Sequence, residues 1–213
     1  SLAEWGAPDV VILPGSKSVV HDLAALRAAG LAEAICRHAA GDGWLLGICG
    51  GLQMLGMAID DPDHVESPQD STPGLGLIDV RTSFAARKTL LRVLRADSPL
   101  GLPASGYEIH HGRTICGPDA DILFRRRELP AGQLADADCG YGRGRRWGTY
   151  LHGLFDDDAF RRAWLDHVRL SLGRPPAGRM LATYDTETAL DRLAGVVREC
   201  CRLDVIYKEL GLA

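Results

Sequence analysis

Short apolar runs alternate with helix-length apolar stripes along the first sixty residues. Residues 10–13 and 44–48 are continuous apolar runs of strand length, whereas residues 18–29, 31–40 and 50–58 are typical of helices. Ser18 is the expected N-cap of the first helix. This order predicts parallel strands joined by right-handed crossovers. We therefore expect an α/β fold with its site at the carboxyl ends of the strands.

The pattern changes in the middle of the chain. Residues 60–73 are polar and rich in Asp, Pro and Ser, which predicts an exposed loop. Two amphipathic helices are expected at residues 159–172 and 186–207, the second with its apolar face docked on this domain. Short strand-like pieces separated by glycine turns predict an antiparallel extension of the sheet; they lie at residues 76–82, 89–95, 106–110, 121–124 and 147–151.

Residues 47–53 read Gly-Ile-Cys-Gly-Gly-Leu-Gln and place Cys49 at a sharp turn between an expected strand and an expected helix. This pattern is typical of a nucleophile elbow, where free amides at the helix start favour a thiolate and an adjacent oxyanion. A cysteine buried only for packing, or a glycine-rich turn that binds phosphate, is the alternative. Of the six cysteines, only Cys49 has glycines at positions −2, +1 and +2, which favours attack on an acyl carbon.

A reactive cysteine needs a base, and His152 ends the strand-like run of residues 147–151. Catalytic residues of open α/β sheets gather at such strand ends. His110 and His111 are rivals, because residues 106–114 also mix strand formers with polar groups. We expect His152 to hold the thiol proton and to deliver it to a leaving amine.

At these residues the chain resembles a known family. Residues 47–53 match the G-x-C-x-G-x-Q motif of class I, triad-type glutamine amidotransferases, and residues 151–153 resemble their histidine segment. The strings at residues 12–18, 74–79 and 106–114 resemble the glutaminase domain of the cobyric acid synthase family. The resemblance runs from about residue 9 to about residue 173. It implies a flavodoxin-like fold, in which an open, mostly parallel sheet is flanked by helices in three layers.

The resemblance also implies an activity and site roles. Cys49 and His152 would hydrolyse glutamine, with backbone N–H groups of Gly50 and of Gly15 or Ser16 stabilising the oxyanion. The ammonia would serve ATP-dependent amidation of corrin carboxyl groups in cobalamin biosynthesis. The residues expected to bind substrate are Gln53, Lys88, Tyr107, Glu108, His110 and Arg113, with Lys88 and Arg113 as candidates for the α-carboxylate.

The chain departs from the class at the third member of the triad. Most class I amidotransferases carry Glu two residues after the histidine, and here that position is Leu154. The resemblance therefore implies either a Cys–His dyad or an orienting carboxylate from elsewhere, such as Glu108 or Asp156.

The chain also lacks the phosphate-binding pattern G-x-x-x-x-G-K-S/T. We expect residues 1–213 to be one glutaminase domain without a cofactor or metal of its own, and part of a longer two-domain enzyme. ATP and Mg²⁺ are expected in its ATP-dependent amidoligase domain, and the glutaminase would be poorly active alone. The alternatives are a glutaminase of a related amidoligase, for cobyrinic acid diamide or cell-wall lipid amidation, or a non-catalytic docking module.

Net charge and composition limit the classes of binding partner that we expect. A net charge of −4 over 213 residues gives no overall basic field for nucleic acid. The run Arg125-Arg126-Arg127 is either a solvated face or a contact for corrin carboxylates or the amidoligase domain. We find no signal peptide, no long apolar span and no disulfide-framework spacing among the six cysteines, so we expect a cytoplasmic protein without a membrane partner.

Overall fold

The computed structural model describes residues 2–127 and 137–212. They form two compact units, Ser1–Gly178 and Arg179–Ala213. The first unit contains the sheet and every candidate site residue. A 3₁₀ turn, η1 (Leu2–Glu4), precedes its first strand.

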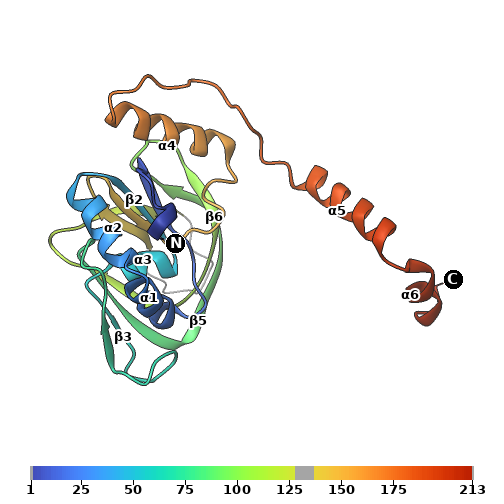
Figure 1. The fold of residues 1–213 in the computed structure, drawn as a ribbon, viewed down its shortest axis with the longest axis horizontal. Helices are drawn as coiled ribbons and strands as arrows, with labels where there is room; N and C mark the ends of the chain where they lie inside the picture. Colours follow the sequence, from blue (N-terminus) through green and yellow to red (C-terminus); the bar gives the residue numbers. More distant parts are fainter. Residues whose placement is uncertain (1, 128–136, 213) are drawn as a thin grey trace. The chain divides into compact units, whose positions relative to one another are not determined.

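A mixed sheet forms the centre of the first unit (Figure 1). Within the described ranges it has nine strands in the order β1-β2-β9-β8-β7-β5-β3-β4, with β6 paired to β5. The strands are β1 (Val10–Leu13), β2 (Trp44–Ile48), β3 (Ala58–Asp60), β4 (Ser71–Pro73), β5 (Val80–Asp97), β6 (Ala104–Cys116), β7 (Asp121–Arg126), β8 (Asp138–Arg143) and β9 (Arg146–Thr149). The pairs β1–β2, β2–β9 and β3–β5 are parallel, and the others are antiparallel. The predicted α/β fold with an antiparallel extension is confirmed.

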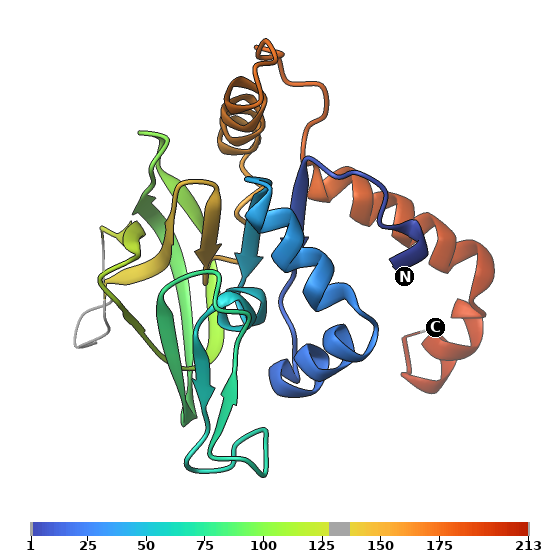
Figure 2. The same cartoon turned by 60° about the vertical axis from the view of Figure 1, so that its left-hand side comes forward.

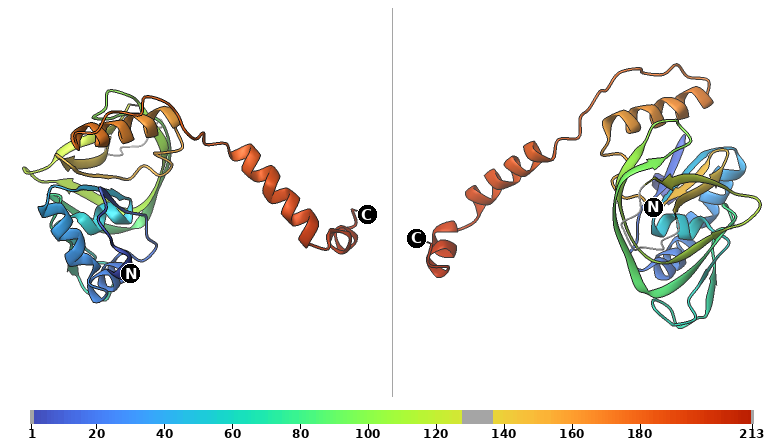
Figure 3. Two further views of the ribbon diagram at one scale, coloured as in Figure 1. Left: turned by 45° about the horizontal axis from the view of Figure 1, so that its top comes forward. Right: turned by 180° about the vertical axis from the view of Figure 1, so that it is seen from behind.

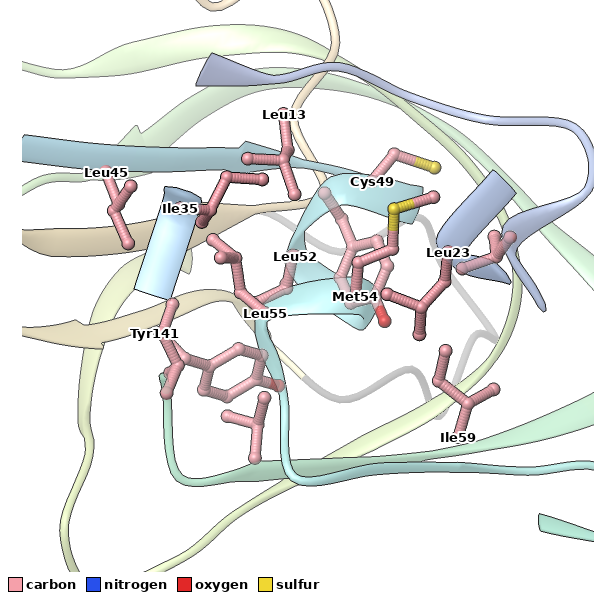
Figure 4. Packing of buried hydrophobic residues seen from close by; sticks show 14 of the residues in the cluster. Leu13, Leu23, Ile35, Leu45, Cys49, Leu52, Met54, Leu55, Ile59 and Tyr141 are labelled. Carbon is pink, nitrogen blue, oxygen red and sulfur yellow. The ribbon is translucent and has the colours of Figure 1, made fainter. Parts of the chain in front are cut away.

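Helices cover both faces of the parallel strands. They are α1 (Val19–Ala28), α2 (Leu31–Ala40), α3 (Gly50–Leu55) and α4 (Asp158–Ser171). Successive side chains of β2 point to opposite faces. Leu45 therefore joins the core cluster of α1–α3, where it packs with Leu52 (Figure 4), whereas Trp44 and Leu46 join the opposite cluster with Trp164 of α4. This arrangement gives the three layers that the resemblance implied.

The structure corrects the expected elements around the loop of residues 60–73. Residues 58–60 and 71–73 are the short strands β3 and β4, and α3 ends at Leu55 because the chain turns into β3. The two strands expected at 76–82 and 89–95 are one long strand, β5, which runs beside β6 (Figure 2) with a register shift between Ser83 and Lys88. β8 was not expected from the pattern.

The second unit contains two helices, α5 (Thr186–Cys200) and α6 (Leu203–Glu209) (Figure 3). The single helix expected at 186–207 is therefore wrong in its extent, because Cys201 has an extended backbone with φ −104° and ψ 143°. Docking of the apolar face of α5 on the first unit stays a prediction. No helix in the described parts of the chain combines the length and apolar character needed to cross a lipid bilayer.

Candidate active site

Cys49 stands at a contorted turn between β2 and α3. Its φ of 53° and ψ of −110° lie in a region that non-glycine residues rarely adopt. Close packing on both sides explains the flanking glycines: a Cβ on Gly47 would lie 2.6 Å from the backbone nitrogen of Leu52, and a Cβ on Gly51 would overlap the carbonyl of Leu13. The amide of Cys49 donates to the carbonyl of Thr149 at 2.8 Å, which ties the turn to β9. This backbone is that of a nucleophile elbow.

His152 follows β9 and is held by β6. Its amide donates to the carbonyl of Tyr107 at 2.8 Å, and the amide of Tyr107 donates back at 3.1 Å. The two rings stack with centroids 5.1 Å apart and an interplanar angle of 12°. The Nε2 atom of His152 is buried and has no hydrogen-bond partner among the described residues. A buried, unpaired ring nitrogen is costly, so its presence here favours a role in proton transfer.

Cys49 and His152 both lie beside Gly15, at the carboxyl ends of β1, β2 and β9. A Cβ on Gly15 would lie 3.1 Å from Cε1 of His152 and 3.7 Å from Cβ of Cys49. Both residues line one cavity of about 720 Å³. That volume suits a small-molecule site. The cysteine and the histidine predicted as a pair from the sequence therefore lie in one cavity.

The environment shifts the pKa values of Cys49 and His152 in opposite directions. Burial raises the pKa of the Cys49 thiol, the amide of Gly50 acts against that shift, and the charges of Glu66 and Glu108 add to it. Burial lowers the pKa of His152, and the nearby His110 lowers it further. At neutral pH the free site thus holds a thiol and a neutral imidazole, so thiol activation requires proton transfer to a base. The thiol points to the carbonyl of Ile109 at 3.5 Å in this structure.

Backbone amides for an oxyanion lie next to the sulfur. The Gly50 amide is hydrogen-bonded to Cys49. Gly15 and Ser16 line the cavity, and a Cβ on Gly50 would be only 2.9 Å from the backbone nitrogen of Ser16. The three predicted oxyanion residues are therefore close neighbours.

Three of the six predicted substrate-binding residues line the cavity: Gln53, Lys88 and His110. Gln53 is 2% exposed, and its Nε2 donates to the carbonyl of His111 at 3.2 Å and to the hydroxyl of Tyr150 at 3.3 Å. These bonds fix the side chain of Gln53 where it lines the cavity. Tyr107 does not line the cavity but supports His152 from behind.

Glu108 and Arg113 are not brought to this cavity; both line a separate cavity of about 300 Å³. Glu108 is 1% exposed, and its oxygens bind Nη1 of Arg126 at 2.7 Å and Nε2 of His110 at 3.2 Å. It therefore acts on His110 and not directly on His152. The amide of Asp156 donates to the carbonyl of Gly153 at 2.9 Å, and the carboxylate of Asp156 lies beside Gly153. These contacts favour the dyad over an orienting carboxylate from Glu108.

The arginine run divides into two exposed side chains, Arg125 and Arg127, and one buried side chain, Arg126. Arg125 pairs with Asp138 at 2.8 Å, Arg127 pairs with Asp97 at 2.6 Å, and Arg126 is buried against Glu108. Each arginine thus has a carboxylate within this domain.

His111 of β6, predicted as a rival base, and Lys17, in the string of residues 12–18, also line the cavity. Sequence reasoning missed Val19 at the start of α1, Val65 and Glu66 in the loop after β3, and Phe84 of β5. No local motif marks them, because the loop reads only as polar and the strands only as amphipathic. No group of three or more His, Cys, Asp or Glu side chains in residues 2–127 and 137–212 is placed to hold a metal ion.

Fold and site together define a class I glutamine amidotransferase-like domain. The chain belongs to the CobB/CobQ-like glutamine amidotransferase domain family, whose model matches residues 2–160. A solved glutamine amidotransferase has the same fold, with a TM-score of 0.52 at 17% identity over 75% of this chain and 78% of that one.

Two relatives are similar to this chain over nearly its whole length. The cobyric acid synthase of Nitratidesulfovibrio vulgaris is 41% identical over 99% of this chain and 44% of its own length. The adenosylcobalamin biosynthesis bifunctional protein CobDQ of Leptospira interrogans is 40% identical over 100% of this chain and 24% of its own length. The chain thus spans less than half the length of the curated relatives it matches.

Proposed function

We propose that this domain hydrolyses glutamine at Cys49 and supplies the ammonia to an ATP-dependent amidoligase domain that amidates corrin carboxyl groups. The observation that carries the proposal is the elbow cysteine in one cavity with His152, whose buried Nε2 has no hydrogen-bond partner among the described residues. The names of the full-length relatives support the corrin substrate and the second domain. ATP and Mg²⁺ belong to that second domain in this proposal.

The first half-reaction releases ammonia. Glutamine enters with its side-chain amide beside Cys49, and His152 takes the thiol proton as the sulfur attacks the amide carbon. The oxyanion is stabilised by the amide of Gly50 and by that of Gly15 or Ser16. The carbon–nitrogen bond then breaks, His152 gives its proton to the leaving nitrogen, and a thioester remains on Cys49.

The second half-reaction restores the site. His152 takes a proton from water as the water attacks the thioester carbonyl, and glutamate leaves as the sulfur regains the proton. A lowered pKa suits His152 to this role, because the imidazole must be neutral at the start of both steps. Lys88, at the cavity edge, is our candidate for the α-carboxylate of glutamine, and Gln53 holds the floor beneath the amide.

The test uses Cys49→Ala in the full-length protein, with glutamine or free ammonia as nitrogen source. We expect glutamine-dependent amidation to fall about 10⁴- to 10⁶-fold, because the nucleophile is gone, while ammonia-dependent amidation stays within twofold. Cys200→Ala, an exposed cysteine of the second unit, is the matched control and leaves both activities unchanged. Glutamine-dependent activity that survives Cys49→Ala would refute the proposal.

A further inference from the structure

The loop after β3 is built around one buried carboxylate. Asp61 is 1% exposed and accepts hydrogen bonds from the amides of Val65 at 2.7 Å, Glu66 at 2.8 Å and Ser67 at 2.8 Å. Burial acts to raise the pKa of Asp61, but these amide bonds outweigh it and hold the pKa below its ordinary value. The backbone at Glu66 is therefore fixed, and the direction of its side chain is set by the fold.

Glu66 lies in the catalytic cavity with one oxygen already engaged. Its Oε2 accepts from the amide of Val19, the first residue of α1, at 2.8 Å, and its carboxylate also accepts from the amide of Val20. Ser18, the residue in the N-cap position, makes no side-chain cap bond, so Glu66 takes the role that the sequence predicted for Ser18. Capping α1 explains one face of this carboxylate. It does not explain why a carboxylate from a distant loop also faces Cys49.

The charge of Glu66 works against the free site. It raises the pKa of Cys49, and burial raises the pKa of Glu66 itself. In the part of the chain that the structure describes, no lysine or arginine forms an ion pair with Glu66. Backbone amide bonds and the nearby His111 offset part of the cost of burying this carboxylate, yet burial still raises the pKa of Glu66, and a cationic ligand would stabilise its charged form.

We propose that Glu66 binds the α-ammonium group of the glutamine substrate. The inference rests on the proposed glutaminase function and names how that site selects an α-amino acid. Lys17 and Lys88 line the same cavity and supply positive charge for the α-carboxylate, so the cavity matches both ends of a zwitterion while Cys49 faces the amide.

Substrate binding would then also activate the nucleophile. An ammonium group at Glu66 cancels the negative charge that opposes a thiolate at Cys49. The other charged or titratable groups that line the cavity are Lys17, Lys88, His110, His111 and His152. Glu108, which is hydrogen-bonded to His110, also raises the pKa of Cys49. Cys49 is thus more reactive with a correct substrate bound than in the empty site.

The test compares two substrates in the full-length protein and in Glu66→Gln. Glutaramate keeps the amide and the carboxylate of glutamine but lacks the ammonium group. Glutamine at position 66 still offers an oxygen to the Val19 amide, so the cap is retained. We expect kcat/KM for glutamine to fall about 10- to 100-fold, and kcat/KM for glutaramate to stay level or rise, because loss of the Glu66 charge favours the thiolate of Cys49. Glu33→Gln, an exposed glutamate of α2, is the control.

Equal losses for both substrates would show that Glu66 only caps α1 and would overturn the inference while leaving the glutaminase intact. Absence of glutamine hydrolysis by the wild-type full-length protein would overturn the proposed function and this inference with it.

A second readout needs no turnover. The pH dependence of Cys49 alkylation by iodoacetamide, without substrate, should shift to lower pH in Glu66→Gln, because a charge that raises the thiol pKa has gone. An unchanged profile, or a shift to higher pH, in a variant whose circular dichroism matches wild type would contradict the proposal.

Discussion

The catalytic cavity has two walls that are held in different ways. The first wall, Gly15, Cys49 and His152, stands at the ends of parallel strands, where β2 is paired on both sides by β1 and β9. The second wall, which includes Glu66 and Lys88, comes from a loop and from the antiparallel β5–β6 pair. Its loop is closed at the base by the β3–β4 pair, and amide bonds to Asp61 fix the backbone within it.

This difference matches the two tasks of an amidotransferase site. A nucleophile and its base must keep their geometry within a fraction of an ångström, which suits groups on a sheet that is packed on both faces. Recognition of the ends of a substrate suits side chains that reach in from a loop and a long β-ribbon. In the proposed mechanism the first wall carries the chemistry and the second carries selectivity, so we expect changes on the two walls to give different kinetic losses.

Loss of the base on the first wall gives the largest expected effect in this series. His152→Ala should lower glutamine hydrolysis by roughly 10²- to 10⁴-fold, because the thiol loses its proton acceptor. His21→Ala on α1, whose side chain is 80% exposed, is the control and should stay within twofold. Steady-state glutamate release in the full-length protein measures both, and a fully active His152→Ala would remove His152 from the account.

A smaller loss on the same wall should come from Gly15→Ala. The new Cβ would press on Cε1 of His152 at 3.1 Å, so the imidazole must move. We expect kcat to fall about 10- to 100-fold with KM little changed. Gly195→Ala in α5, where a Cβ meets no atom within 4 Å, is the matched glycine control. A normal kcat in Gly15→Ala would show that this wall tolerates displacement.

On the second wall, Asp61→Asn should affect stability and substrate binding more than chemistry. The amide side chain of Asn has one acceptor oxygen for three backbone donors, so we expect a loss of about 1–3 kcal/mol in the free energy of unfolding and a raised KM for glutamine. Asp63→Asn, an exposed neighbour in the same loop, is the control. Urea unfolding and initial rates measure the two effects, and a loss of kcat alone would contradict the division between the walls.

The smallest effect that we expect is the change of activity with pH near neutrality. His152 must be neutral to accept a proton, and its pKa lies below the ordinary value of 6.5. The kcat/KM for glutamine should therefore be flat near pH 7 and should decline only as the pH falls below 6.5 and His152 becomes protonated. Initial rates across buffers check this, and an acid limb centred above pH 7 would be inconsistent with a desolvated His152.

The first wall could be predicted from the sequence because its signals are local. A strand-length apolar run, a cysteine among glycines and a helix start follow one another at residues 44–55, and each is read within a few positions. His152 was found in the same way, from a strand-like run that ends at a histidine. The pairing of Cys49 with His152 then followed from the rule that parallel strands end at one edge.

The second wall could not be predicted, because its residues are assembled by long-range contacts. Glu66 reaches an amide 47 positions away, and its direction depends on Asp61, whose burial no polar loop pattern reveals. Glu108 was expected near the substrate, but its pairing with Arg126 turns it to the other cavity. A pattern of alternating polar and apolar residues predicts a strand. It does not predict which side chain will pair with a buried charge such as Glu108.

The most direct test of the account is covalent trapping of the nucleophile. The full-length protein, treated with the glutamine analogue diazo-oxo-norleucine and analysed by peptide mass spectrometry, should carry one label, on Cys49, and glutamine should protect against it. A label on another cysteine, or an unlabelled Cys49 in protein that hydrolyses glutamine, would contradict the assignment.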